Sequence, residues 1–195
     1  MAAMIDEKRL ESGSSATETI RNNSIPQKVA IFIWRAKLNR LPVRSELGKR
    51  GIDLDSVLCP ICGNEIETVE HSLIKCKKVT EFWIFFFLIW WNVPVCNLNA
   101  LDPLANDGIF TSFTKYGKSI WEAVKWVGCY VLWKSRNNKV FNRKEWSISS
   151  IISEVQTTTF GWIAKRSKKF FLDWHQWIIN PEFYVDSLIN RLGIG

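Results

Sequence analysis

The chain has 195 residues, of which 47% are hydrophobic and 23% are charged, and this balance excludes a wholly disordered protein. Its formal net charge of +7 at pH 7 favours a polyanionic partner, because net charge governs association rather than fold. Eleven Trp and twelve Phe are a large aromatic content, and we expect most of them to be buried in a core.

Two features bear on where the protein works. The longest apolar run, Phe82 to Trp91, has ten residues, about half of the roughly 20 that a membrane span requires. The cysteine count is odd, at five, and the chain does not open with the apolar segment of a signal peptide. We therefore expect a soluble, intracellular protein (nucleus or cytoplasm) without a membrane partner, where clustered cysteines bind metal more often than they form disulfides.

The N-terminal part predicts a polar segment followed by two helices. Residues 1–25 are rich in Ser, Thr and Asn, which predicts a disordered lead-in. From Lys28 to Asn39, apolar residues cover all but a narrow basic stripe, so packing should nearly surround this helix. Pro42 disfavours helical geometry in the residue before it, and a second helix is expected from about Val43 to Arg50. We interpret this helix-turn-helix as a plain helical hairpin, with DNA reading as the alternative.

The next segment places four metal-ligand side chains within 18 residues: Cys59, Cys62, His71 and Cys76. Their spacing is C-x2-C-x8-H-x4-C, and three thiolates with one imidazole form the shell that structural zinc prefers. Pro60 stiffens the turn between the first two cysteines, and Gly63 lets the backbone fold so that amides point at the sulfurs. Because protein side chains fill all four positions, we predict one structural Zn²⁺ rather than a catalytic one.

Geometry adds a condition to this prediction. His71 and Cys76 are five residues apart, which is about 140° around an α-helix, so they do not share one helical face. The short helix expected to begin at Glu67-Thr68 must therefore end or distort near Lys75 if both residues are to bind the same ion.

Downstream, apolar patterning predicts helices at 79–91, 119–141, 147–165 and 170–179, the last of which should stop at Asn180-Pro181. Residues 93–118 predict an irregular linker and residues 181–195 a tail. The expected fold class is mainly α. It consists of a small helical zinc-binding module (26–92), made of a helix-turn-helix, a Cys3His knuckle and a helix, followed by a helical C-terminal region (119–180).

Basic residues concentrate in the first two helices. Residues 28–50 have a net charge of +6, whereas residues 51–76 have a net charge of −4. This contrast makes the first segment a candidate nucleic-acid-binding surface, formed by Lys28, Arg35, Lys37, Arg40, Arg44, Lys49 and Arg50. A second basic run, residues 165–169, could also follow a phosphate backbone, but we interpret it as a solvated face.

The sequence contains no catalytic set. Cys96 and Cys129 lie in apolar surroundings that predict small buried residues, and His175 has no nucleophile in a suitable local context. A phosphate-binding Gly-rich loop and the paired Asp residues of a polymerase are both absent. We therefore expect neither enzymatic activity nor a small-molecule substrate.

Several separate sequence pieces occur in an order typical of one family. They are PQKVAIFIWR (26–35), NRLP (39–42), RGI (50–52), CPICG (59–63), ETVEH (67–71), Cys76 and Phe82-Trp83. In this order they resemble the zinc-binding domain found downstream of the reverse transcriptase domain in plant LINE-type non-LTR retrotransposons. Residues 133–142 resemble, less specifically, the segment that often follows in those elements.

The resemblance implies that Cys59, Cys62, His71 and Cys76 are the zinc ligands. It also implies that the chain is a C-terminal fragment of such an element, working beside the reverse transcriptase and holding element RNA or target DNA. RNA-directed DNA polymerase activity would then belong to the parent protein, since polymerase palm, endonuclease and RNase H residues are missing here. The alternative is a protein-interaction module that docks on a reverse transcriptase domain through aromatic side chains of residues 82–91.

Overall fold

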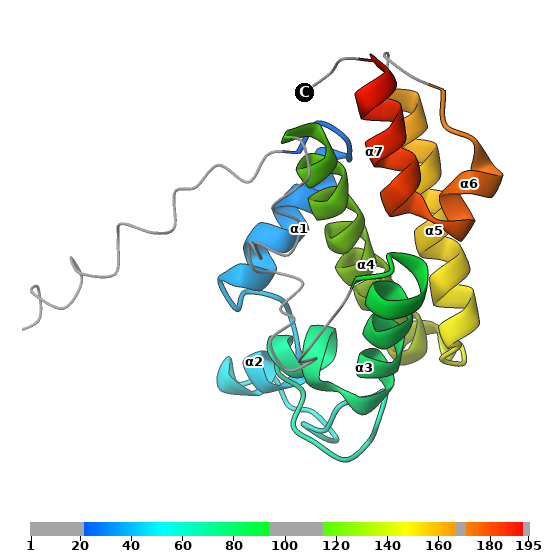
Figure 1. Ribbon diagram of the computed structural model, residues 1–195. Coiled ribbons are helices and arrows are strands. Elements are labelled where there is room, and N and C mark those ends of the chain that lie inside the picture. The colour runs from blue at the N-terminus through cyan, green and yellow to red at the C-terminus, as the bar shows by residue number, and fades with distance from the viewer. Residues whose placement is uncertain (1–21, 94–114, 167–170, 193–195) are drawn as a thin grey trace, which may run out of the picture.

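The computed structural model describes residues 22–93, 115–166 and 171–192, and these residues form a mainly α fold, as predicted. The helices of Figure 1 are α1 (Gln27–Lys37), α2 (Arg44–Lys49), α3 (Lys77–Ile84), α4 (Lys115–Asn142), α5 (Ile148–Arg166), α6 (Trp174–Ile179) and α7 (Pro181–Leu192). Two π-helical segments, η2 (His71–Lys75) and η3 (Phe85–Trp90), flank α3. The described residues contain no strand, only an isolated bridge between Leu58 and Ile66.

Helix α4 is the centre of the fold. It contacts α1, α5, α7 and η2, and Figure 1 shows it running between α1 and α5. The face predicted to be apolar, with Trp121, Val124 and Gly128, is buried. The helix begins at Lys115, so residues 115–118 are helical rather than part of the predicted linker. Residues 94–114, which include Cys96, lie outside the described part of the chain.

Residues 22–25 are ordered, although the sequence places them in the predicted lead-in. Asn22 and Ile25 are buried, and the Asn22 side-chain amide donates a hydrogen bond of 2.7 Å to the carbonyl oxygen of Ser119 in the first turns of α4. The predicted lead-in of residues 1–25 is therefore wrong for its last four residues, while residues 1–21 lie outside the description. The contact spans 97 sequence positions, so no local pattern could reveal it.

Helix α1 ends at Lys37, before the predicted boundary. Its buried side is apolar, with Val29, Phe32 and Ile33 packed inward. Asn39 follows the helix with a φ of 52°, a left-handed conformation that Asn tolerates better than most residues. The turn toward α2 therefore starts at Asn39, three residues before Pro42.

The aromatic run of residues 82–91 lies in the core. The predicted single helix is divided into α3 and η3, and most of its aromatic side chains are buried: Phe82, Trp83, Phe86, Phe87, Trp90 and Trp91. The indole of Trp90 also donates a hydrogen bond of 3.1 Å to the carbonyl oxygen of Trp177 in α6. Leu88 and Ile89 are the exposed large apolar residues of this run. The aromatic surface required for docking on a partner is therefore largely used within the fold.

In the C-terminal helices, the start of α5 agrees with the sequence prediction, whereas the start of α6 and the existence of α7 differ from it. The hydroxyl of Ser147 accepts a hydrogen bond of 3.3 Å from the Ser150 amide and so caps the start of α5, near the predicted helix start at residue 147. Helix α6 starts at Trp174, capped by Asp173, rather than near residue 170. The predicted tail of residues 181–195 is wrong over Pro181–Leu192, which form α7. Proline has no amide to satisfy and suits the first helical position, so Pro181 ends one helix and begins another.

Membrane insertion finds no support in this part of the fold. Within residues 22–93, 115–166 and 171–192, every helix is too short or too polar to span a bilayer.

Candidate metal centre and the adjoining basic surface

A tight hairpin places the first two cysteines. The amide of Cys59 donates to the carbonyl oxygen of Glu65 at 2.7 Å, and the Glu67 amide donates to Val57 at 2.9 Å. Gly63 closes the turn by donating to the carbonyl oxygen of Cys59 at 2.8 Å, with a φ of 73°. A side chain at this φ would be strained even though the space around Gly63 is open, so glycine is required here for its backbone conformation.

A π-helical turn brings in the other two ligands. The Cys76 amide donates to the carbonyl oxygen of His71 at 2.8 Å, an i to i+5 bond. This wider turn brings residues five apart closer to the same side than an α-helix does. The distortion expected before Cys76 is thus confirmed. The helix itself begins at Val69 rather than Glu67, and the Thr68 hydroxyl accepts a hydrogen bond from the His71 amide.

The four predicted ligands form one cluster. The ligand atoms of Cys59, Cys62, His71 and Cys76 all lie within 4.8 Å of one another, and Cys62 Sγ is 3.4 Å from His71 Nε2. A tetrahedral zinc site with Zn–S bonds of about 2.3 Å separates its sulfurs by about 3.8 Å, so only a small contraction is needed. Donor types, number and spacing therefore all fit one structural zinc ion.

Backbone amides stabilise negative charge on the sulfurs. The Ile61 amide lies 3.4 Å from Cys59 Sγ, and Cys76 precedes α3, where the amides of Lys78 and Val79 hydrogen-bond its sulfur. The Cys59 thiol hydrogen-bonds to Cys76, and this bond, together with burial, raises the pKa of Cys59; the same bond lowers the pKa of Cys76. Of the two hydrogen-bonded cysteines, Cys76 is therefore the one that more readily becomes the thiolate that a metal requires.

The histidine is oriented by a carboxylate. His71 is buried, and its Nδ1 lies 3.3 Å from Glu65 Oε2, while its Nε2 faces Cys62. A carboxylate on one ring nitrogen holds the proton there and leaves the other nitrogen free to bind metal. Glu65 is therefore a supporting residue that the ligand spacing did not identify.

A second supporting contact connects the site to the core. Arg136 of α4 donates from Nε and Nη2 to both carboxylate oxygens of Glu67, at 2.6 and 2.5 Å, and both side chains are buried. The same carboxylate accepts from the Arg44 amide at 2.8 Å and from the Ser72 hydroxyl at 3.3 Å. Glu67 thus joins the hairpin, α2, η2 and α4. Glu67 lies in the ETVEH segment (67–71) and Arg136 in residues 133–142, but no local pattern in the sequence pairs them.

The seven predicted basic residues divide into two groups. Lys28 lies over the rings of Tyr130 and Trp162, Arg44 donates to the carbonyl oxygen of Leu58 at 2.8 Å, and Lys49 pairs with Glu46 at 2.7 Å. The other four make no side-chain hydrogen bond or ion pair with the described residues and are exposed: Arg35, Lys37, Arg40 and Arg50. Arg35, Lys37 and Arg50 can therefore neutralise phosphates without losing an existing contact, whereas the Arg40 guanidinium lies over the Trp34 ring, 6.0 Å from its centroid.

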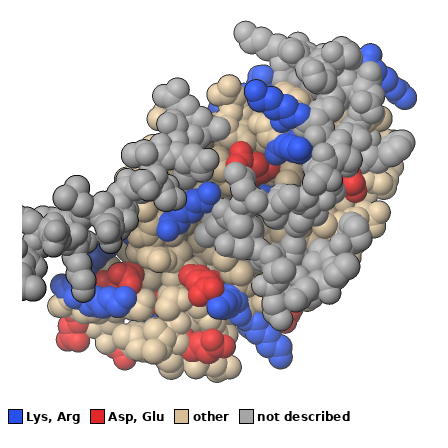
Figure 2. Space-filling view, turned by 60° about the vertical axis from the view of Figure 1, so that its left-hand side comes forward, with Lys and Arg blue, Asp and Glu red and all other residues tan. Residues whose placement is uncertain are grey.

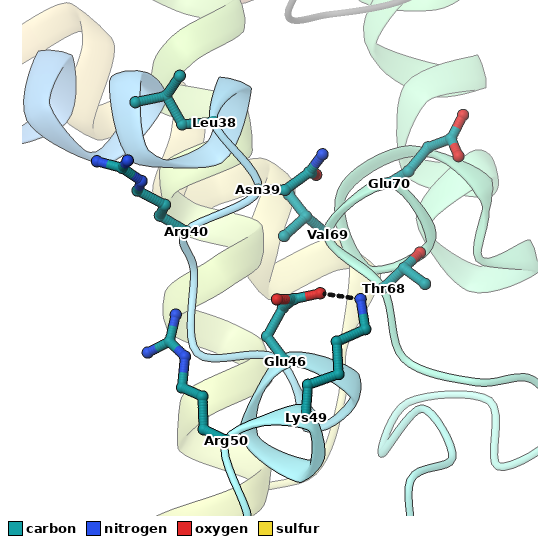
Figure 3. Close-up of a pocket in the computed structure, with 9 residues that line it drawn as sticks. All are labelled: Leu38, Asn39, Arg40, Glu46, Lys49, Arg50, Thr68, Val69 and Glu70. Atoms are coloured by element: carbon teal, nitrogen blue, oxygen red, sulfur yellow. Dashed lines mark hydrogen bonds and ion pairs between the residues drawn. The ribbon is translucent and has the colours of Figure 1, made fainter. Parts of the chain in front are cut away.

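Some of these residues line a groove of about 570 Å³ between the end of α1, helix α2 and the start of the His71 helix. Figure 3 shows Arg40 and Arg50 on one side, the Glu46–Lys49 ion pair at the bottom, and Thr68 and Glu70 across from them. Figure 2 shows basic and acidic side chains interspersed on the visible face, not a continuous basic patch. The local cationic groups, rather than the total charge, therefore define the candidate surface.

The remaining chemical candidates do not join this site. Cys129 is buried in α4, in agreement with its predicted role as a small core residue, and His175 is exposed on α6. Among the residues that the structure describes, the Cys3His group is the metal-type cluster found.

Comparison with known proteins gives one match. Residues 4–83, less than half of the chain, match the family model described as zinc-binding in reverse transcriptase. No curated protein and no solved structure matches the chain. The matched domain is an accessory one, distinct from the polymerase catalytic domain. Residues 4–83, which carry all four predicted zinc ligands, are therefore similar to the zinc-binding domain of reverse transcriptases.

Proposed function

We propose that this chain is a non-catalytic module of a reverse transcriptase polyprotein from a plant LINE-type non-LTR retrotransposon, in which a structural Zn²⁺ supports RNA or DNA binding beside the polymerase. The observation that carries the proposal is the position of two exposed arginines that make no hydrogen bond or ion pair with the described residues. Arg40 and Arg50 line a groove whose other wall includes Thr68 and the start of the helix that begins at Val69 and contains His71. A metal ion bound to His71 would therefore also fix the position of this wall of the groove.

The geometry does not favour the alternative of DNA reading by a helix-turn-helix. Helix α2 has only six residues; Arg44 binds the Leu58 carbonyl, and Lys49 binds Glu46. A recognition helix needs free side chains to reach base edges in the major groove. Phosphate contact by Arg35, Arg40 and Arg50 requires no such helix. The docking alternative is also weakened, since most aromatic side chains of residues 82–91 are buried.

The test is a charge reversal with a matched control. The triple variant Arg35→Glu, Arg40→Glu, Arg50→Glu should bind labelled RNA and single-stranded DNA much more weakly in a filter-binding salt titration. Loss of three phosphate contacts should make the negative slope of log K against log salt shallower by about 2. Arg44 is left unchanged because it donates a hydrogen bond to the carbonyl oxygen of Leu58, in the hairpin that carries Cys59 and Cys62.

The control variant Lys144→Glu, Lys165→Glu, Arg166→Glu makes the same charge change at exposed positions on or beside the C-terminal helices. It should retain most of the binding. Unchanged binding in the groove variant, or an equal loss in the control, would contradict the proposal. Zinc content and thermal unfolding of both variants establish that they are folded.

A further inference from the structure

We propose that Trp34 and Arg40 form a stacking site for unpaired bases at the rim of the groove, so that the nucleic acid bound there is single-stranded. The inference rests on the proposed function and specifies its ligand. Trp34 stands out because it is 39% exposed in a fold that buries most of its tryptophans. It lies on α1, one turn before Leu38, which lines the groove.

The surroundings of Trp34 match what a base requires. The Arg40 guanidinium lies over its ring, 6.0 Å from the centroid, and Arg40 itself lines the groove. Neighbouring Ile31 is 49% exposed and extends the apolar surface along α1. Aromatic rings and arginine planes are the groups on which proteins stack splayed bases, with cations following the phosphates.

The preference for a single strand follows from the accessibility of the base faces. In a duplex the faces of the bases are stacked on one another, so an exposed indole has no face to bind, and only the arginines contribute. An unpaired strand offers both faces and phosphates. Stacking on Trp34 therefore adds affinity only for the unpaired strand, while the phosphate contacts of Arg35, Arg40 and Arg50 act on either form.

The experiment compares Trp34→Ala with the native chain by fluorescence anisotropy, using a 12-nucleotide oligo(U), oligo(dT), a duplex of equal length and an abasic deoxyribose strand. Trp34→Ala should weaken binding to oligo(U) or oligo(dT) about tenfold. Affinity for the duplex and for the abasic strand, which keeps its phosphates, should be unchanged. The oligo(U) and oligo(dT) arms separate an RNA ligand from a DNA one.

Two variants guard against a merely structural effect. Trp34→Phe keeps an aromatic face and should recover most of the loss. Trp174→Ala removes an equally exposed tryptophan, 39%, from α6 and should leave all four affinities unchanged. Equal losses for single strand and duplex in Trp34→Ala, or no loss, would overturn the inference while leaving arginine-dependent binding intact. If the native chain binds none of the four probes, the proposed function fails with it.

Discussion

The hairpin of residues 57–67 and the α4–α5 pair are stabilised in different ways. The hairpin exposes Val57, Leu58 and Ile66, so it has little apolar interior of its own. Helices α4 and α5 bury apolar side chains against each other and against α1 and α7. This contrast predicts that the hairpin depends on a bound metal for its order, whereas the α4–α5 pair depends on packing. Glu67 and Arg136 are the point at which the two are joined.

Loss of the metal should produce the largest difference in stability between the hairpin and the α4–α5 pair. Structural zinc in small sites contributes about 10 kcal/mol or more of apparent binding free energy, and here that energy orders the hairpin and η2. Cys62→Ser, or chelation, should abolish zinc binding and remove hydrogen-exchange protection from residues 57–76, while α4 and α5 remain helical. Metal content by mass spectrometry and exchange rates are the measurements.

Cys129 provides the control for this experiment, because it is a buried cysteine of α4 outside the ligand cluster. Cys129→Ser should retain one zinc ion per chain. Continued protection of residues 57–76 after zinc removal would show that packing alone holds the hairpin.

Breaking the junction should have the next largest effect. Arg136→Met leaves the Glu67 carboxylate buried without its charge partner, which typically costs about 3–5 kcal/mol of unfolding free energy. Glu67→Gln should also destabilise the fold, and the double variant should cost less than the sum of the two. Urea denaturation measures all three.

The same helix supplies a matched control. Lys134 of α4 pairs with Glu154 of α5 at 2.5 Å, but both side chains are partly exposed. Lys134→Met should therefore cost less than about 1 kcal/mol. Equal costs for Arg136→Met and Lys134→Met would contradict the role of the buried pair as the junction.

The smallest effect concerns packing within the core. A Cβ at Gly128 would lie 3.0 Å from Trp83 Cη2 and 3.5 Å from Phe82, so Gly128→Ala should cost about 1–3 kcal/mol by overpacking. Gly161, inside α5, has no atom within 4 Å of the same position. Gly161→Ala should instead gain about 0.5–1 kcal/mol from helix propensity. Thermal unfolding should show a lower Tm for Gly128→Ala and a higher Tm for Gly161→Ala. If both variants shift Tm in the same direction, the space around these glycines does not determine the change in stability.

Local features of the sequence predicted much of the site. Four ligands within 18 residues could be identified from their chemistry and spacing, and the mismatch between five residues and an α-helical turn predicted the distortion before Cys76. Most helices followed from apolar periodicity. Asn180-Pro181 predicts the end of a helix, but Pro181 is also the first residue of α7, so the sequence pattern does not reveal this second helix.

Contacts between distant residues could not be predicted in this way. Glu67 and Arg136 are 69 positions apart, and Asn22 and Ser119 are 97 apart, so neither pair leaves a local pattern. The seven basic residues were equivalent in the sequence. Their division into engaged and free groups depends on which carbonyls, rings and carboxylates the fold places beside them.

The sequence by itself determined the helical class and the metal-ligand set, because both follow from interactions among residues close along the chain. Tertiary structure decided that the aromatic excess is mostly core, that Arg35, Lys37 and Arg50 make no side-chain contact with the described residues, and that Trp34 remains at the surface. These outcomes depend on which surfaces α4 covers when the chain packs, and burial of apolar area is a property of the whole fold.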